Sequence, residues 1–177
     1  KHLTMIGNFR HPPNLDAVHW LHQEIWPMIR AQLPECELHL YGSYPSKEVM
    51  ALDSKEKGFR VKGLIEDAVA VLSQYRIFLA LLRFGAGIKG KIADSWQAGT
   101  PVLTTPIGSE GMEDQGRFAG LIAKDAKDFA EKVIGLYSDT SAFQKLQSQG
   151  TLSLCHLYPV EKNRNTLLMR LNAHSSK

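Results

Sequence analysis

Short apolar segments alternate with amphipathic ones along most of the 177-residue chain, and this alternation limits the possible fold more than any other feature. The apolar segments are 3–9, 37–43, 59–65, 76–82, 101–106 and 120–123. Several are nearly continuous in apolar residues, as strands are when helices cover both faces of their sheet. Strands that alternate with helices predict an α/β, Rossmann-like fold, with a parallel sheet of about six strands between two helical layers.

The segments between these strands have helical periodicity. Helices are predicted over 13–33, 46–56, 67–75, 91–99 and 125–139, with two more over 141–172. Pro27 is expected to kink or split the first helix, and the final two are expected to separate near Gly150 or Pro159. Asp67 is placed to cap the third helix, and Gly99 is placed to end the fourth.

Length and composition exclude several classes of protein. A chain that is 44% hydrophobic and 22% charged builds an ordinary globular core, and its length indicates one domain. A net charge of +3 without a basic stripe does not indicate a nucleic-acid partner. No apolar run approaches the ~20 residues of a transmembrane segment, and no signal peptide opens the chain. Cys36 and Cys155 are interpreted as two separate thiols.

The most informative stretch is FGAGIKGKIADSWQAGTPV, residues 84–102, which leaves a predicted strand and enters a predicted helix. Ligands of parallel sheets bind beyond the carboxyl ends of the strands, where this stretch lies. Gly85 and Gly87 carry no side chain that would keep a ligand from the backbone N–H groups. A helix that begins near Ile88 would direct its free N–H groups and its positive dipole end to the same place. Together these features predict a binding site for a diphosphate.

Two lysines and one asparagine near this site are ambiguous. Lys89 is predicted to lie in the first helical turn, where it could stabilise a departing nucleoside diphosphate. Lys91 is expected to point to solvent, because side chains two positions apart on a helix diverge. Asn14 is predicted to be a cap or first-turn residue of the long first helix rather than a ligand contact.

The stretch also satisfies two known phosphate-loop patterns. It matches the start of a Walker A loop, but Ile92 stands where a P-loop needs the Ser or Thr that binds magnesium. It also matches the G-x-G-x-x-G pattern, with Glu110 twenty residues after Gly90. That pattern belongs at the first strand of a dinucleotide fold, whereas here it follows the fourth. A fragment of an NAD-dependent oxidoreductase therefore stays open only as an alternative.

The ordered set of motifs resembles the donor-binding, carboxyl-terminal half of GT-B glycosyltransferases, most closely the retaining family four, or group 1. The matching segments are IGNFRHPPNLDAVHWLHQEIWPMI, ELHLYGSYP, FRVKGLIED, the glycine-rich stretch with QAGTPVL, and SEGM. They cover roughly residues 3–135. The resemblance implies that residues 1–177 form one nucleotide-sugar-binding domain. It also implies an amino-terminal acceptor domain that would precede Lys1 and is absent from this sequence.

The resemblance further implies roles for individual residues. Many members carry two Glu residues separated by seven positions, and the corresponding residues here are Ala86 and Asp94. The first acid, which contacts the donor sugar in the family, is therefore missing, while Asp94 would bind the ribose hydroxyls. Its alternative role is an exposed charge paired with Lys91.

Two other loops would complete the donor site. Arg10, after the first strand, would reach the diphosphate. Gly63, Leu64 and Ile65 would receive the nucleobase, or this strand end simply packs into the core.

The implied reaction is glycosyl transfer from a nucleoside-diphosphate sugar, with retention and without a metal or other cofactor. The isolated domain is expected to bind nucleotide weakly and to catalyse nothing. The protein is expected in the cytoplasm, with any peripheral membrane contact made by the missing half. A non-catalytic binding module of the same fold and a sugar-nucleotide 2-epimerase stay open as alternatives. His19 and His22 share a helix face, but without a third ligand nearby they predict no metal site.

Overall fold

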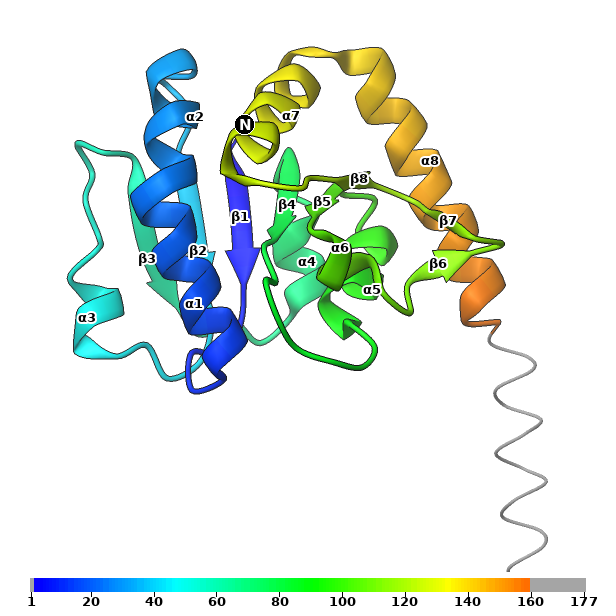
Figure 1. Cartoon of the computed structure of the whole chain (residues 1–177), viewed down its shortest axis with the longest axis horizontal. Helices are drawn as coiled ribbons and strands as arrows, with labels where there is room; N and C mark the ends of the chain where they lie inside the picture. The colour runs from blue at the N-terminus through cyan, green and yellow to red at the C-terminus, as the bar shows by residue number, and fades with distance from the viewer. Residues whose placement is uncertain (1, 160–177) are drawn as a thin grey trace, which may run out of the picture.

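The structure, a computed structural model, describes residues 2–159. Its centre is a six-stranded sheet with the order β3-β2-β1-β4-β5-β8, in which every neighbouring pair is parallel (Figure 1). The strands are β1 (Leu3–Ile6), β2 (Leu38–Tyr41), β3 (Phe59–Gly63), β4 (Ile77–Ala80), β5 (Val102–Thr104) and β8 (Leu121–Ile122). The predicted α/β fold is confirmed, and each predicted apolar segment contains one of these strands.

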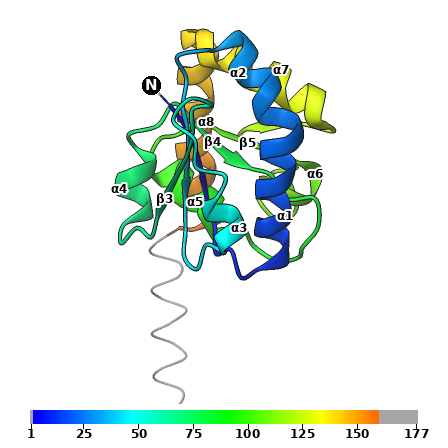
Figure 2. The ribbon, with the colours of Figure 1, turned by 90° about the vertical axis from the view of Figure 1, so that its left-hand side faces the viewer.

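Helices cover both faces of the sheet, as Figure 2 shows with α1 and α4 on opposite sides of the strands. α1 (Pro12–Trp20), α2 (Trp26–Gln32) and α7 (Ala126–Ser138) share one core with Ile77 and Leu79 of β4. α4 (Ala68–Leu72) and α5 (Gly90–Gln97) share the other core with Phe78 and Ala80. Side chains alternate between the two faces of a strand, so this strand can be apolar throughout and supply both cores.

The first predicted helix is not split at Pro27. A π-helical turn, Leu21–Ile25, joins α1 to α2, and the backbone N–H of Trp26 donates to the Leu21 carbonyl. Proline lacks an N–H, and its ring clashes with the carbonyl four residues earlier in an α-helix. The wider turn directly before Pro27 removes that clash, so the chain stays helical from α1 into α2.

The predicted break at Gly150 is wrong, because α8 (Thr140–Leu157) runs through it. A Cβ at Gly150 would lie 2.6 Å from Cδ1 of Trp96. Glycine therefore allows α8 to approach α5 closely, and it does not end the helix. α8 instead ends at Leu157, two residues before Pro159, where the alternative break was predicted. The second predicted helix would lie beyond residue 159, outside the described residues.

Shorter elements complete the chain: α3 (Lys47–Met50), α6 (Pro106–Ser109), and the hairpin of β6 (Glu113–Asp114) and β7 (Arg117–Phe118), which was not predicted. The expected cap of α4 is confirmed, since the Asp67 carboxylate accepts the N–H of Ala70 at 2.9 Å. Gly99 follows α5 with a φ of +70°, also as expected. Among residues 2–159, no helix combines the length and the apolar character that a membrane crossing requires.

Candidate functional site

The loops that follow β1 to β4 meet at the edge of the sheet where these parallel strands end, which we call the carboxyl edge. In Figure 1 the arrow of β1 points toward this edge. A pocket of about 520 Å³ opens there, and its walls come from those loops and from the start of α5. Its volume lies within the range of small-molecule sites, and its place is the one expected for a ligand of a parallel sheet.

Bare backbone forms one wall of this pocket. Gly85 and Gly87 have φ values of +123° and +86°, in the region that favours glycine. Gly85 lines the pocket, whereas Gly87 lies between two lining residues, Ala86 and Ile88, without lining it itself. A Cβ at Gly87 or Gly90 would meet no atom within 4 Å. Gly87 and Gly90 are therefore not packed against neighbouring side chains, and a Cβ at Gly85 would make only an ordinary contact with Pro13, at 3.6 Å. They give the loop its conformation and leave the space beside its backbone open.

α5 begins at Gly90, two residues later than the helix start predicted near Ile88, and Lys89 is its N-cap residue. No side chain accepts the first N–H groups of this helix. The Ile88 side chain is 68% exposed and lines the pocket. The start of α5 thus brings uncapped N–H groups to the carboxyl edge.

Lys89 lies in the pocket wall with only 6% of its surface exposed. Its Nζ donates to the backbone carbonyl of Glu110 at 3.2 Å. Within residues 2–159, Lys89 forms no ion pair. A buried ammonium group is thus held by a neutral oxygen. The residue that the dinucleotide pattern would assign to a ribose, Glu110, supplies its backbone here rather than its side chain.

Lys91 does not point to solvent, so that expectation is wrong. Its Nζ lies 2.7 Å from Oδ1 of Asn14 and 3.5 Å from the carbonyl oxygen of Ile6. Burial lowers the pKa of Lys91 to about 8. The start of α1 covers this side of α5, a contact that helix geometry alone could not reveal. Asn14 itself lies in the first turn of α1, as predicted, and its side-chain amide donates to the Asn8 carbonyl at 3.0 Å.

Asp94 lies one turn further along α5, half-buried and outside the pocket lining. Burial raises the pKa of its carboxyl group. Within the described part of the chain its carboxylate forms no ion pair, so the suggested pair with Lys91 is absent. Ala86, in the position of the family's first acid, does line the pocket.

The predicted nucleobase loop reaches the pocket from the other side. Leu64 and Ile65 line it together with Glu66, and the Leu64 side chain is 74% exposed. The alternative in which this strand end packs into the core is therefore wrong for Leu64. Gly63, with a φ of +81°, turns the chain at the end of β3, and its carbonyl accepts the N–H of Gly42.

Arg10 lies at the carboxyl edge but does not line the pocket. Its guanidinium carbon lies 3.7 Å from the centre of the Tyr44 ring, and both side chains are exposed. Its backbone N–H donates to Oδ1 of Asn8 at 3.0 Å. Among the pocket residues that the sequence did not assign to a ligand are Lys91, Asn14 and Glu66. Glu66 lies in the loop after β3 and Asn14 lies in the first turn of the helix after β1, so the strand-end rule could have found both.

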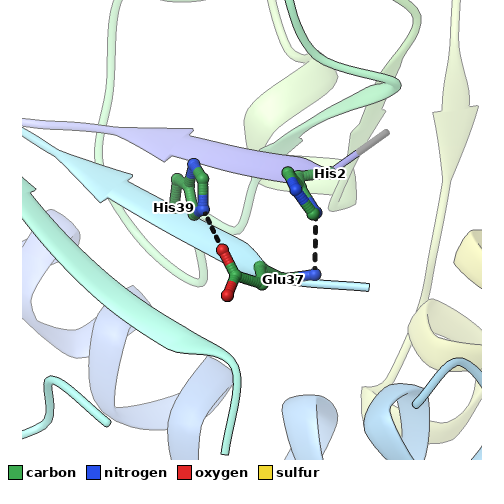
Figure 3. Close-up of side chains that lie close together, drawn as sticks. All are labelled: His2, Glu37 and His39. Atoms are coloured by element: carbon green, nitrogen blue, oxygen red, sulfur yellow. Dashed lines mark hydrogen bonds and ion pairs between the residues drawn. The ribbon is translucent and has the colours of Figure 1, made fainter. Parts of the chain in front are cut away.

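A second polar cluster lies at the opposite edge, where the strands begin, which we call the amino edge (Figure 3). The pairing of Leu3 with Leu38 makes His2 and Glu37 neighbours, and His39 follows on the same face of β2. The potential metal-binding atoms of His2, Glu37 and His39 lie within 4.8 Å of one another. The sequence analysis weighed only His19 and His22 as a metal-binding pair. The Glu-x-His pattern of residues 37–39, at the start of a strand, is the signal that could have revealed this cluster.

Each residue of this cluster has at least one hydrogen-bond partner within the protein. Nε2 of His39 lies 2.8 Å from Oε2 of Glu37, and its Nδ1 lies 2.7 Å from the Tyr75 hydroxyl. That hydroxyl lies 2.8 Å from the hydroxyl of Tyr41. Nδ1 of His2 accepts the backbone N–H of Glu37. At the amino edge, each of the three side chains therefore already takes part in a hydrogen bond within the protein.

Comparisons with known proteins identify the family to which the chain belongs. Residues 1–139 match the profile of the family described as "Glycosyl transferases group 1". An uncharacterized 44.6 kDa protein in the cps region of Klebsiella pneumoniae is 24% identical over 151 residues. That match covers 81% of this chain and 39% of the Klebsiella protein.

Solved structures share the fold. One is the pneumococcal O-GlcNAc transferase GtfA in complex with UDP and GlcNAc. The match covers 96% of this chain and 36% of the GtfA chain, at 17% sequence identity and a TM-score of 0.73. Another is Anabaena Alr3699/HepE in complex with UDP-glucose. That match covers 97% of this chain and 48% of the HepE chain, at 11% sequence identity and a TM-score of 0.76. A third is the G117R mutant of S. aureus TarM in a complex that includes UDP. That match covers 95% of this chain and 34% of the TarM chain, at 13% sequence identity and a TM-score of 0.76.

The chain thus spans less than half the length of each of these relatives. The family profile covers residues 1–139, well over half of the chain. The chain therefore belongs to the group 1 glycosyltransferases, and its fold is that of one Rossmann-like half of a GT-B protein.

Proposed function

We propose that this chain is the donor-binding half of a glycosyltransferase, which holds a nucleoside-diphosphate sugar in the pocket at the carboxyl edge. The observation that carries the proposal is Lys89, a buried cation on the pocket wall whose only bonded partner among the described residues is a neutral carbonyl. Burying a charge without an opposite charge is unfavourable, so an anion in the pocket would complete the site. The complexes of GtfA and HepE with UDP or UDP-glucose support a ligand of this class.

The diphosphate would lie against the loop that ends at Ile88. The backbone of Gly85 and Gly87 would let its oxygens approach the N–H groups, and the start of α5 would add its positive dipole end. Lys89 would neutralise the charge that develops as the nucleoside diphosphate leaves the sugar. The residues of this chain would thus supply a cation to the leaving group, and we propose a metal-independent reaction.

The nucleoside would extend across the rest of the pocket. Gly63, Leu64 and Ile65 would bind the base through backbone and apolar contacts, and Asp94 would accept the ribose hydroxyls. Arg10 could join the diphosphate only after leaving the Tyr44 ring. The acceptor and the second wall of the cleft would come from another Rossmann-like domain, and retention of the sugar's stereochemistry is proposed from the family.

Ala86 favours a second candidate, a binding module of the same fold that catalyses nothing. It lines the pocket where many family members carry the acid that contacts the sugar. Transfer assays with the full-length protein distinguish the candidates, because a binding module would hold the sugar nucleotide without releasing nucleoside diphosphate.

Calorimetric titration of the chain with UDP, GDP and NADH tests the proposal. We expect UDP or GDP to bind and NADH not to bind, and we expect Lys89→Met to weaken binding on the order of tenfold or more. Lys145→Met, an exposed lysine on α8, is the matched control and should bind as the wild type does. Binding of NADH alone would contradict the proposal.

A further inference from the structure

Lys91 occupies a position at the pocket that its present contacts do not fully explain. An ammonium group has three N–H donors, and the described oxygens near Lys91 are the Asn14 side chain and the Ile6 carbonyl. Both oxygens are neutral, and Lys91 forms no ion pair within residues 2–159. One donor and the whole positive charge therefore remain for a ligand in the pocket that Lys91 lines.

The two lysines of α5 approach the pocket from opposite sides. Lys89 is held by Glu110, which follows α6, whereas Lys91 is held by Asn14 and Ile6, at the end of β1 and the start of α1. Their divergence on the helix thus places two cations on two walls. A diphosphate carries negative charge on two separate phosphates, which suits a cation on each side.

The loop after β1 also carries Arg10, which the sequence analysis predicted to reach the diphosphate. In the structure, however, the Arg10 guanidinium group stacks on the exposed Tyr44 ring outside the pocket lining. We propose that Lys91 is a second cation for the donor diphosphate and takes the place predicted for Arg10, an inference that rests on the proposed function.

The inference includes a pH dependence. Burial lowers the pKa of Lys91 to about 8, so part of the unliganded protein has lost this proton at pH 8. A bound diphosphate favours the charged form, so binding at pH 8 takes up protons. The other ionisable residues that line the pocket are His11, Glu66 and Lys89, and Asp94 lies one turn away on α5. A His11→Gln background removes the histidine from the measurement.

The test is calorimetry at pH 8 in two buffers that differ in ionisation enthalpy, which measures affinity and proton uptake together. The probes are UDP-glucose and GDP-mannose, because their diphosphates lack the terminal phosphate that titrates near pH 6. We expect Lys91→Met to weaken binding of the better probe on the order of tenfold and to abolish proton uptake. Lys91→Arg, which is always charged, should bind within a few-fold of wild type without proton uptake.

Two further variants separate this role from a structural one. Asn14→Ala removes the contact that braces Lys91 but keeps the cation, so it should retain proton uptake. Arg10→Met should weaken binding less than Lys91→Met does. Wild-type binding by Lys91→Met, or a larger loss in Arg10→Met, would overturn the inference while leaving the proposed function standing. Failure of both probes and of UDP and GDP to bind the wild type would overturn the proposed function itself.

Discussion

The two polar edges of the sheet differ in how far their charged groups are satisfied. At the amino edge, His39 bonds to both Glu37 and Tyr75, so the carboxylate lies beside the side chain that binds it. At the carboxyl edge, Lys89 and Lys91 bond only to neutral oxygens among residues 2–159. A concentration of polar residues therefore does not by itself mark a binding site in this molecule. Charge that lacks an opposite charge marks it better.

The pair of Glu37 and His39 illustrates the satisfied state. The distance between them is short enough for an ion pair. However, burial, the largest cause, lowers the pKa of His39, while the hydrogen bond from His39 lowers the pKa of Glu37. Both shifts agree with a neutral imidazole whose Nε2–H donates to a carboxylate and whose Nδ1 accepts from Tyr75. We therefore treat this contact as a hydrogen bond to a charged group at neutral pH.

The largest expected effect tests how the carboxyl edge is held together. A Cβ at Gly42 would lie 1.7 Å from the Gly7 carbonyl oxygen, so the loops after β1 and β2 could not keep their spacing. Gly42→Ala should lower the free energy of unfolding by about 3 kcal/mol or more, measured by urea denaturation. Gly87→Ala is the matched control, because it meets no neighbouring atom and should cost about 1 kcal/mol through its backbone conformation alone.

The second prediction breaks the satisfied edge. Tyr75→Phe removes the hydroxyl that bonds both His39 and Tyr41, and leaves a nitrogen of the buried His39 imidazole without its partner. We expect a loss of about 1–3 kcal/mol in the free energy of unfolding, without a change in nucleotide affinity. Thermal and urea unfolding check the first expectation, and titration with UDP and GDP checks the second. A loss of nucleotide binding would mean that the two edges are coupled.

The third prediction has the opposite sign at the unsatisfied edge. Lys89→Met removes a buried charge and keeps most of the side-chain volume, so the unliganded protein should become more stable by about 1 kcal/mol. The same variant should weaken nucleotide binding, as proposed above. Denaturation in the absence of ligand provides the measurement. Destabilisation by more than ~1 kcal/mol would show that the bond to the Glu110 carbonyl outweighs the cost of burial.

The smallest effect is a pH dependence from the amino edge. The pKa of His39 is lowered in the folded protein, so the unfolded chain takes up the proton first as the pH falls below about 6.5. The pKa of Glu37 is also lowered in the folded protein. Its contribution to the free energy of unfolding is therefore lost as the pH falls below the unfolded value near 4.5. Stability should therefore decline from pH 7 toward pH 4, and His39→Gln should flatten the upper part of that decline. An equal slope in the variant would assign the dependence elsewhere, for example to His22, whose pKa burial also lowers.

The sequence predicted the sheet well because each strand is an apolar run that both cores require. It also located the pocket, because the glycine-rich stretch follows a strand at the ligand-binding edge. It could not predict the direction of Lys91 or the stacking of Arg10 on Tyr44, since both depend on neighbours from other elements. The helix break predicted at Gly150 was wrong for the same reason. The sequence does not show that the Trp96 ring packs against this glycine, so its presence inside a helix was interpreted as a helix end.

The π-helical turn before Pro27 has a consequence for comparing relatives. Its wide turn accommodates one residue more than an α-helix of equal length would, within the Leu21–Ile25 segment. Leu21 and Ile25 within the turn and Ile29 after it all remain buried. Homologues with an ordinary helix here are therefore expected to align with a one-residue gap near residues 22–24. Aligning them without the gap would place surface positions of one protein opposite core positions of another.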